Sequence, residues 1–226
     1  MKLPHIVLIT GTDTGVGKTV TTAALASALQ AEGRSVAVYK PCQSGAAAGD
    51  SDCTEIIRLA GPLTAEAGVV LQKPLAPVPA AALDGVKLPP LAAHAARVRE
   101  LASTHDHVLV EGSGGLLVEL DADGGTLADL GGHLGRDATF VLVARPALGT
   151  LNHTALTLEA LDRRELAVQG VVLGAWPDEP GVLEHGNRAT IGLLRPLIGV
   201  LPERAADLPP VTFREASTHW LSGAWS

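Results

Sequence analysis

A glycine-bearing loop that ends in lysine and threonine is the stretch of this sequence with the clearest chemistry. The segment GTDTGVGKT, residues 11–19, follows the apolar run HIVLIT and precedes VTTAALASALQAEG, so it joins an expected strand to an expected helix. Backbone N–H groups in such a loop attract an anion, Lys18 can reach the outer phosphates of a nucleotide, and Thr19 offers a hydroxyl to Mg²⁺. The strict pattern has glycine where this chain has Thr12, with Gly11 one residue earlier. A nucleoside triphosphate site is favoured over a structural turn.

Acidic residues that could complete a Mg²⁺ site lie in two other segments. Glu111 follows the apolar residues HVLV and precedes a glycine turn, which favours a functional acid over a solvent-facing one. Asp52 in GDSDCTEI could instead cap the following helix, and spacing alone favours capping; Asp50 competes for either role. A second lysine is expected near Lys18. Lys40 ends the apolar segment SVAVYKP and is expected in the same cleft as Lys18, where it would act as an electrostatic clamp. An ordinary surface lysine is an equal alternative.

Short apolar segments that alternate with helical ones must position these residues. This alternation predicts an α/β domain whose parallel sheet is covered on both faces. Residues 71–90 are rich in proline and predict a long surface loop. Strands are expected at residues 5–10, 35–41, 105–115, 138–146, 168–176 and 196–202, and helices at 18–33, 50–61, 91–104 and 148–164.

Composition restricts the classes of protein to which the chain can belong. Its 226 residues suit one domain, 1–226, and 46% apolar residues can fill a large core. The net charge of −7 provides no basic footprint for nucleic acid. No apolar run reaches the roughly 20 residues that span a membrane. There is no secretion signal, and Cys42 and Cys53 do not suggest a disulfide framework, so we expect a reduced, cytoplasmic protein. The tail, residues 212–226, is expected to pack either on the core or on a partner.

Five segments together resemble one enzyme family. GTDTGVGKT, YKPCQSG, SDCTEI, VEGSGGLLVEL and LGTLNHTALTLEAL look like the dethiobiotin synthetase family of biotin biosynthesis, across residues 6 to about 180. The resemblance implies a P-loop NTPase-type, three-layer α/β/α fold with a mainly parallel sheet. It implies a ligase that carboxylates 7,8-diaminopelargonate with CO₂ or bicarbonate and closes a cyclic urea. That reaction passes through a carbamate and a carbamic–phosphoric anhydride and yields dethiobiotin, ADP and phosphate.

The resemblance also assigns roles to individual residues. It implies catalytic roles for Lys40, Lys18 and Thr14, and it raises Asp52 above its capping alternative. The metal ligands would be Thr19, Asp52 and Glu111. Substrate would be bound by Ser44 and, from the opposite subunit of a homodimer, by Gly149, Thr150, Leu151 and Asn152. The nucleotide would contact Gly15, Val16, Gly17, Lys18, Thr19, Val20, Glu111, Gly112, Ser113, Gly114, Gly174, Ala175, Leu201, Pro202 and Glu203.

The sequence departs from the family pattern at the expected base site. Many relatives have an Asn-Asp pair where this chain has Gly174 and Ala175, so the usual adenine-reading residue is missing. We therefore expect Mg²⁺ and ATP to be used with relaxed base selection, which extends to CTP or another nucleoside triphosphate.

Three other interpretations compete with this one. A ParA/MinD-like nucleotide switch shares the strand–loop–helix start, but such switches usually have an extra lysine early in the loop, and this chain has none before Lys18 within it. An amidotransferase-type ligase needs an ammonia-generating domain for which 226 residues leave little room. A non-catalytic nucleotide-binding module does not account for Lys40 and Glu111 at the same edge.

Overall fold

A seven-stranded parallel sheet forms the centre of the protein. The computed structural model describes residues 3–49 and 51–221. Within them the strand order is β3-β2-β4-β1-β5-β6-β7, and each neighbouring pair is parallel. The predicted parallel sheet is therefore confirmed. The strands are β1 Ile6–Gly11, β2 Val36–Gln43, β3 Thr64–Val70, β4 His107–Gly115, β5 Ala138–Ala144, β6 Val168–Trp176 and β7 Leu197–Pro202.

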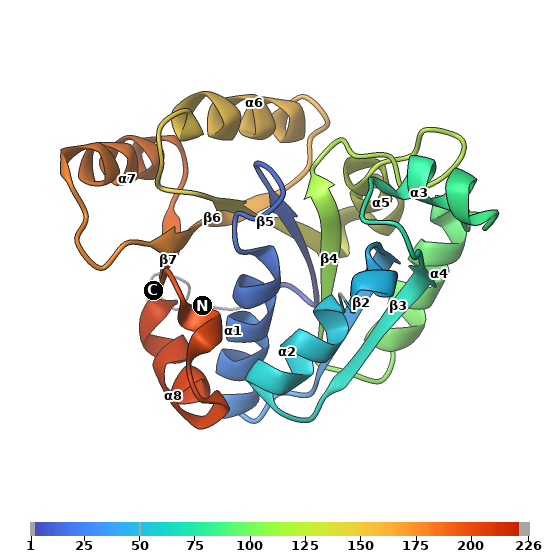
Figure 1. Ribbon diagram of the computed structural model, residues 1–226, viewed down its shortest axis with the longest axis horizontal. Coiled ribbons are helices and arrows are strands. Elements are labelled where there is room, and N and C mark those ends of the chain that lie inside the picture. The colour runs from blue at the N-terminus through green and yellow to red at the C-terminus, as the bar shows by residue number, and fades with distance from the viewer. Residues whose placement is uncertain (1–2, 50, 222–226) are drawn as a thin grey trace.

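Helices cover both faces of the sheet and complete three layers (Figure 1). Apolar residues of α1, α2 and α8 pack on one face, and those of α3 to α7 pack on the other. The three-layer α/β/α expectation is thus confirmed. The helices are α1 Lys18–Ala31, α2 Asp52–Ala60, α3 Pro77–Asp84, α4 Leu91–Ala102, α5 Leu127–Leu134, α6 Thr150–Asp162, α7 Val182–Leu194 and α8 Pro210–Trp220.

Small residues allow the first helix to pack closely on the sheet. The buried face of α1 contains Ala23, Ala24 and Ala28 beside Leu25 and Leu29, and none of these exposes more than 1% of its surface. A chain with 3% aromatic residues builds its core in this way, from many short aliphatic side chains at close helix–sheet distance. The result is a rigid platform for the loop that precedes α1.

The second strand is longer than the sequence predicted. We expected it to end at Pro41, but β2 continues to Gln43. Beyond Tyr39 the strand pairs only with β3, so its other edge needs no donor and a proline without an N–H is tolerated. Lys40 therefore lies within the strand rather than at its end.

The predicted loop at residues 71–90 is wrong in its centre, where α3 begins at Pro77. Proline suits the first position of a helix because that N–H would have no helical partner. Four further elements were not predicted: β3, α5, α7 and α8. Of the two alternatives for the tail, packing on the core holds for α8, whose Phe213 is fully buried. Asp50 and residues 222–226 lie outside the described residues.

The strand order brings the candidate site together. The loop after β1 lies between the carboxyl ends of β4 and β5, and β2 is the next strand beyond β4. Ligands of open parallel sheets bind at this edge.

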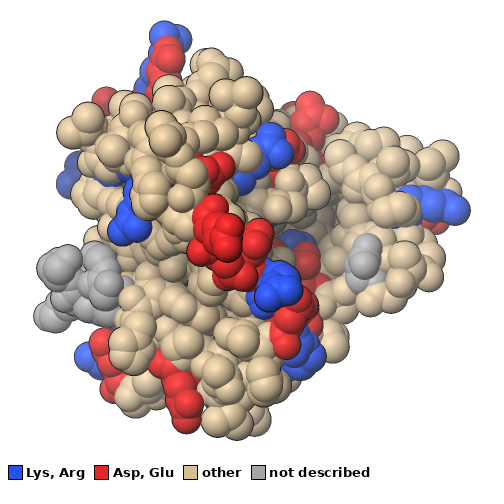
Figure 2. All heavy atoms as spheres, turned by 60° about the vertical axis from the view of Figure 1, so that its left-hand side comes forward, with Lys and Arg blue, Asp and Glu red and all other residues tan. Residues whose placement is uncertain are grey.

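Among the helices of residues 3–49 and 51–221, none combines the length and the hydropathy that a membrane span requires. On the face shown in Figure 2, charged groups of both signs are interspersed among neutral ones.

Candidate active site

The glycine loop after β1 adopts the conformation that an anion cradle requires. Gly15 and Gly17 have φ angles of 73° and 99°, in the left-handed region that favours glycine, and α1 begins directly at Lys18. The Lys18 ammonium donates a hydrogen bond of 3.0 Å to the Asp13 carbonyl oxygen. Burial lowers the pKa of Lys18 and nearby Lys40 lowers it further, while the Glu111 carboxylate opposes both. The lysine is held inside its own loop, facing the space in which phosphates would lie.

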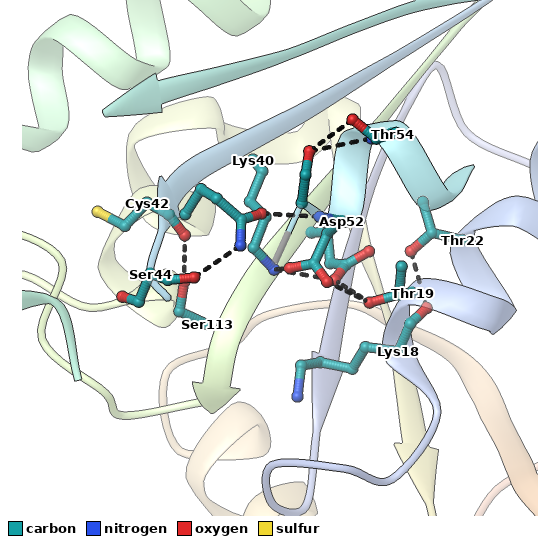
Figure 3. A network of polar contacts seen from close by, with 12 residues as sticks. Lys18, Thr19, Thr22, Lys40, Cys42, Ser44, Asp52, Thr54 and Ser113 are labelled. Carbon is teal, nitrogen blue, oxygen red and sulfur yellow. Dashed lines mark hydrogen bonds and ion pairs between the residues drawn. The ribbon is translucent and has the colours of Figure 1, made fainter. Parts of the chain in front are cut away.

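A second lysine lies between two carboxylates beside this loop. Lys40 Nζ donates to Glu111 Oε1 at 2.9 Å and forms an ion pair with Asp52 (Figure 3). Lys40 and Glu111 are 4% and 1% exposed, so the surface-lysine alternative is wrong. Burial alone would lower the pKa of Lys40, but the charges of Glu111 and Asp52 outweigh it and raise that pKa above its ordinary value. The two carboxylates therefore favour the charged form of Lys40 at the cleft.

The donor set around Thr19 suits a hard divalent cation. Its Oγ1 lies 3.0 Å from Asp52 Oδ1 and 2.9 Å from Glu111 Oε1, either of which can accept its one hydrogen, so three oxygen-bearing groups meet at one point. In the part of the chain that the structure describes, buried Glu111 Oε2 has no hydrogen-bond partner. An orphaned carboxylate oxygen beside a second carboxylate and a hydroxyl is the kind of site that Mg²⁺ takes, with water and phosphate completing its coordination.

The helix-capping alternative for Asp52 is also wrong. The N-cap of α2 is Ser51, whose hydroxyl accepts the N–H of Thr54. Asp52 is the first helical residue, and its carboxylate turns toward Lys40 and Thr19 instead (Figure 3).

A cavity of about 750 Å³ opens over these groups. Twelve of the predicted site residues line it: Thr14, Gly15, Gly17, Lys18, Thr19, Val20, Lys40, Ser44, Asp52, Glu111, Ser113 and Gly114. Such a volume is typical of a ligand site.

Other predicted residues lie outside the lining of this cavity. The side chain of Val16 is buried under the loop, and Gly112 is buried within β4. Gly174 packs against the loop, since a Cβ there would overlap the Val16 carbonyl oxygen. The Glu203 N–H donates to the Trp176 carbonyl at 2.7 Å, which joins the ends of β6 and β7 near the remaining nucleotide candidates: Ala175, Leu201 and Pro202. Gly149, Thr150, Leu151 and Asn152 lie at the start of α6, away from the cavity of their own chain.

Several residues of the site were missed by the sequence analysis. Gln43 follows Lys40 in the quoted segment YKPCQSG, yet it received no role; it is buried and lines the cavity. Residues 74–77 and Val118 form an apolar wall. Arg145 approaches Asp13 at 3.4 Å and braces the start of the loop. The proline run at 74–77 was a usable signal, because two prolines stiffen a wall, but nothing local placed it at the sheet edge.

Comparisons with known proteins find relatives that match nearly the whole chain. A family model described as an AAA domain matches residues 5–210. An ATP-dependent dethiobiotin synthetase of Mycobacterium avium is 48% identical over 97% of this chain and 96% of its own. A protein of the same name from Streptomyces coelicolor is 45% identical over 97% of this chain and 94% of its own.

Solved structures resemble the chain in fold. The septum site-determining protein MinD of Pyrococcus horikoshii, complexed with Mg-ADP, has a TM-score of 0.62 at 18% identity and covers 98% of this chain and 95% of its own. The cell division ATPase MinD of Pyrococcus furiosus has a TM-score of 0.58 at 21% identity, covering 99% and 98%. At these identities the likeness concerns the fold alone.

Proposed function

The chain belongs to the ATP-dependent dethiobiotin synthetase family, and from this premise we propose that its cleft closes a cyclic urea on 7,8-diaminopelargonate. It is a nucleotide-dependent ligase. The observation that carries the proposal is a buried Lys40 that lies beside a phosphate loop and contacts two carboxylates. A ParA/MinD-like switch usually has its extra lysine early in the glycine loop, whereas the second lysine of this cleft lies on β2.

The proposed reaction uses phosphate as a leaving-group activator. One amine takes up CO₂ and loses a proton to give a carbamate. A carbamate oxygen attacks the terminal phosphorus, ADP departs, and a carbamic–phosphoric anhydride forms. The second amine then attacks the carbonyl carbon, phosphate leaves, and the last proton goes to water.

Positive charge is what this chemistry demands of the protein. Carbamate and triphosphate are both anions, so their approach needs neutralisation and alignment more than covalent help. Lys18 would hold the outer phosphates, Lys40 would stabilise charge between the phosphate and the carbamate, and Thr14 and Ser44 would orient the carbamate. The Ser44 hydroxyl is buried and without a hydrogen-bond partner among the described residues, which supports its availability to a ligand.

Thr19, Asp52 and Glu111 would hold Mg²⁺, with Asp50 outside the described residues. The bound ion supplies charge neutralisation for the phosphates and fixes their orientation. The chain's own residues bind, align and exclude water around the reacting groups.

We also propose that the active enzyme is a homodimer. In one chain Gly149–Asn152 begin α6 outside the cavity lining, with Gly149 at φ 91° and Leu148 81% exposed. Placed over a partner's cavity, this helix start would attract the substrate carboxylate.

Free Cys42 and Cys53 thiols support a reducing, cytoplasmic setting.

Base selection is proposed to be relaxed. The asparagine that reads adenine in many relatives would need a Cβ at position 174, where it overlaps the Val16 carbonyl oxygen. We therefore propose that CTP or another nucleoside triphosphate is accepted beside ATP. Rates at low concentrations of both nucleotides test this, and a strong ATP preference would contradict it.

The first experiment is phosphate release from ATP with Mg²⁺, bicarbonate and diaminopelargonate, each omitted in turn. We expect release to require the diamine and mass spectrometry to find the cyclic urea. Lys40→Ala should lose turnover and keep nucleotide binding. Slow release that is indifferent to the diamine would overturn the proposal in favour of a switch.

A further inference from the structure

The buried amide of Gln43 connects two parts of the cleft. Gln43 is the last residue of β2 and is 5% exposed. Its Oε1 accepts the backbone N–H of Asp52 at 2.9 Å, and its Nε2 donates to the Ser44 carbonyl oxygen at 2.8 Å. Both ends of the amide are therefore engaged by backbone groups of residues that the proposed function uses.

The amide projects from a rigid support. Gln43 pairs with Val70 across the sheet, and its carbonyl oxygen accepts the Leu71 N–H at 2.7 Å. The segment that follows is tied down as well, since Gly45 N–H donates to the Lys73 carbonyl at 3.1 Å. A side chain on such a base transmits its position to whatever it binds.

The two partners of Gln43 carry the groups that face the ligands. Asp52 begins α2, and the Gln43 bond fixes the helix start from which its carboxylate reaches Lys40 and Thr19. On the other side, anchoring the Ser44 carbonyl leaves the Ser44 hydroxyl buried and free of protein partners among the described residues.

Gln43, Ser44 and Asp52 also stand between two hollows. They line the cavity of about 750 Å³ and an adjoining one of about 500 Å³. Loss of the amide would open the wall between the two cavities and would leave Ser44 and Asp52 free to move.

We propose that Gln43 is a positioning residue that sets the metal carboxylate of Asp52 through one end of its amide and the substrate hydroxyl of Ser44 through the other. This inference rests on the proposed function. It differs from a plain structural tie because it assigns a separate functional consequence to each end of the amide.

Two variants separate the two ends. Gln43→Met keeps the length and removes both hydrogen bonds, whereas Gln43→Glu keeps the acceptor for Asp52 and loses the donor to Ser44. Gln30→Met is the control, since Gln30 makes one side-chain hydrogen bond to the Pro62 carbonyl on the outside of α1, away from the cleft.

Each variant is measured in two ways. Electron paramagnetic resonance counts Mn²⁺ bound with a non-hydrolysable ATP analogue, and steady-state kinetics gives KM for diaminopelargonate and for ATP. We expect Gln43→Met to weaken Mn²⁺ about tenfold and to raise the diamine KM about tenfold. Gln43→Glu should bind Mn²⁺ at least as tightly as the wild type, because its carboxylate adds negative charge beside Asp52, and it should raise the diamine KM; Gln30→Met should change neither constant.

Other results would overturn the inference. Equal loss of Mn²⁺ affinity in Gln43→Glu and Gln43→Met, or wild-type constants in both, would remove the division of roles. If Gln43→Met does not fold, Gln43→Glu still decides, through a raised diamine KM at a Mn²⁺ affinity no weaker than that of the wild type. A wild type that forms no cyclic urea would overturn the proposed reaction, while the Mn²⁺ comparison would still test the link to Asp52.

Discussion

Replacing Lys40 with methionine should reveal how far the metal site depends on its internal cation. Methionine keeps an unbranched stem of similar length and removes the ammonium that contacts Glu111 and Asp52. Glu111 then remains 1% exposed, with the Thr19 hydroxyl as its remaining side-chain donor among the described residues. A buried carboxylate without its counter-charge should destabilise the fold.

The magnitude follows from the burial of the three groups. Removing one partner of a buried ion pair costs roughly 3–5 kcal/mol. The Asp52 side chain is 29% exposed, so water can solvate it and the lower end, about 3 kcal/mol, is expected. For a chain of this size that corresponds to a fall in Tm of roughly 6–12 °C.

Mg²⁺ should restore part of this loss, because a divalent cation can take the place left by the ammonium. Binding to the native state alone stabilises it by about 2.7 kcal/mol when free metal is at ~100 times its Kd. In the wild type the metal must displace Lys40, so the gain is smaller. Thermal unfolding followed by circular dichroism, with and without Mg²⁺ at matched ionic strength, measures the difference; Lys87→Met, an exposed site, is the control.

Two results would refute this reasoning. A Tm of Lys40→Met equal to that of the wild type would mean that Glu111 does not need the ammonium. An equal rise of Tm with Mg²⁺ in both proteins would mean that Lys40 and the metal do not compete for the carboxylates.

Three further predictions concern the rest of the chain. Asp121→Ala should lower the free energy of unfolding by about 2–3 kcal/mol, since its buried carboxylate accepts the Leu91 N–H at the start of α4 and two more in its own turn; an unchanged urea midpoint would contradict this. Burial lowers the pKa of His94, against the opposing charge of Asp121, so the unfolded imidazole takes up its proton first and stability falls as the pH drops below about 6.5. The variant Tyr39→Phe/His94→Leu should lose this part of the Tm–pH profile, and parallel profiles would argue against it. Burial raises the pKa of the Cys53 thiol to about 11, with Glu111 adding to the effect, so its thiolate at pH 8 is about 100-fold scarcer than that of an ordinary thiol. Ellman's reagent should then label Cys53 slowly in the native chain and quickly in the unfolded chain, and fast native labelling would count against the raised pKa.

The central strands could be predicted because burial on both faces leaves a local signal. β1 and β5 are mainly apolar, with one threonine each, and every residue of both is buried. The glycine loop was equally clear, since Gly15 and Gly17 take positive φ angles that other residues rarely adopt. In these segments the local pattern and the tertiary environment agree.

The edge strand and the helix that follows it could not be predicted, because their sequences mix features of regular elements with features of loops. β3, TAEAGVV, lies at the edge of the sheet and exposes part of its surface, so it shows no continuous apolar run. The helix α3, PVPAAALD, begins with a proline, a residue that also marks loops. The apolar wall at residues 74–77 ends at the first residue of this helix, and it was missed for the same reason.

The contact between Lys40 and Glu111 lies beyond local patterns altogether. The two residues are 71 positions apart, and they meet because β2 and β4 are neighbours in the order β3-β2-β4-β1. The sequence placed both at the same edge but contained no sign of that order. Strand adjacency is settled by long-range packing, so pairs that cross strands are the part of a site that a single sequence states least clearly.

Both active-site lysines are satisfied by the chain itself before any ligand arrives. Lys18 donates to the Asp13 carbonyl, and Lys40 is paired with Asp52 and Glu111. The structure therefore gives each buried ammonium an acceptor, a neutral carbonyl oxygen for Lys18 and two carboxylates for Lys40, and an ammonium without any acceptor would be costly. Each lysine must exchange an acceptor of the chain for a ligand oxygen, and for Lys40 that exchange is favourable only when the ligand brings negative charge of its own. A triphosphate with its metal meets that condition, whereas a neutral ligand does not.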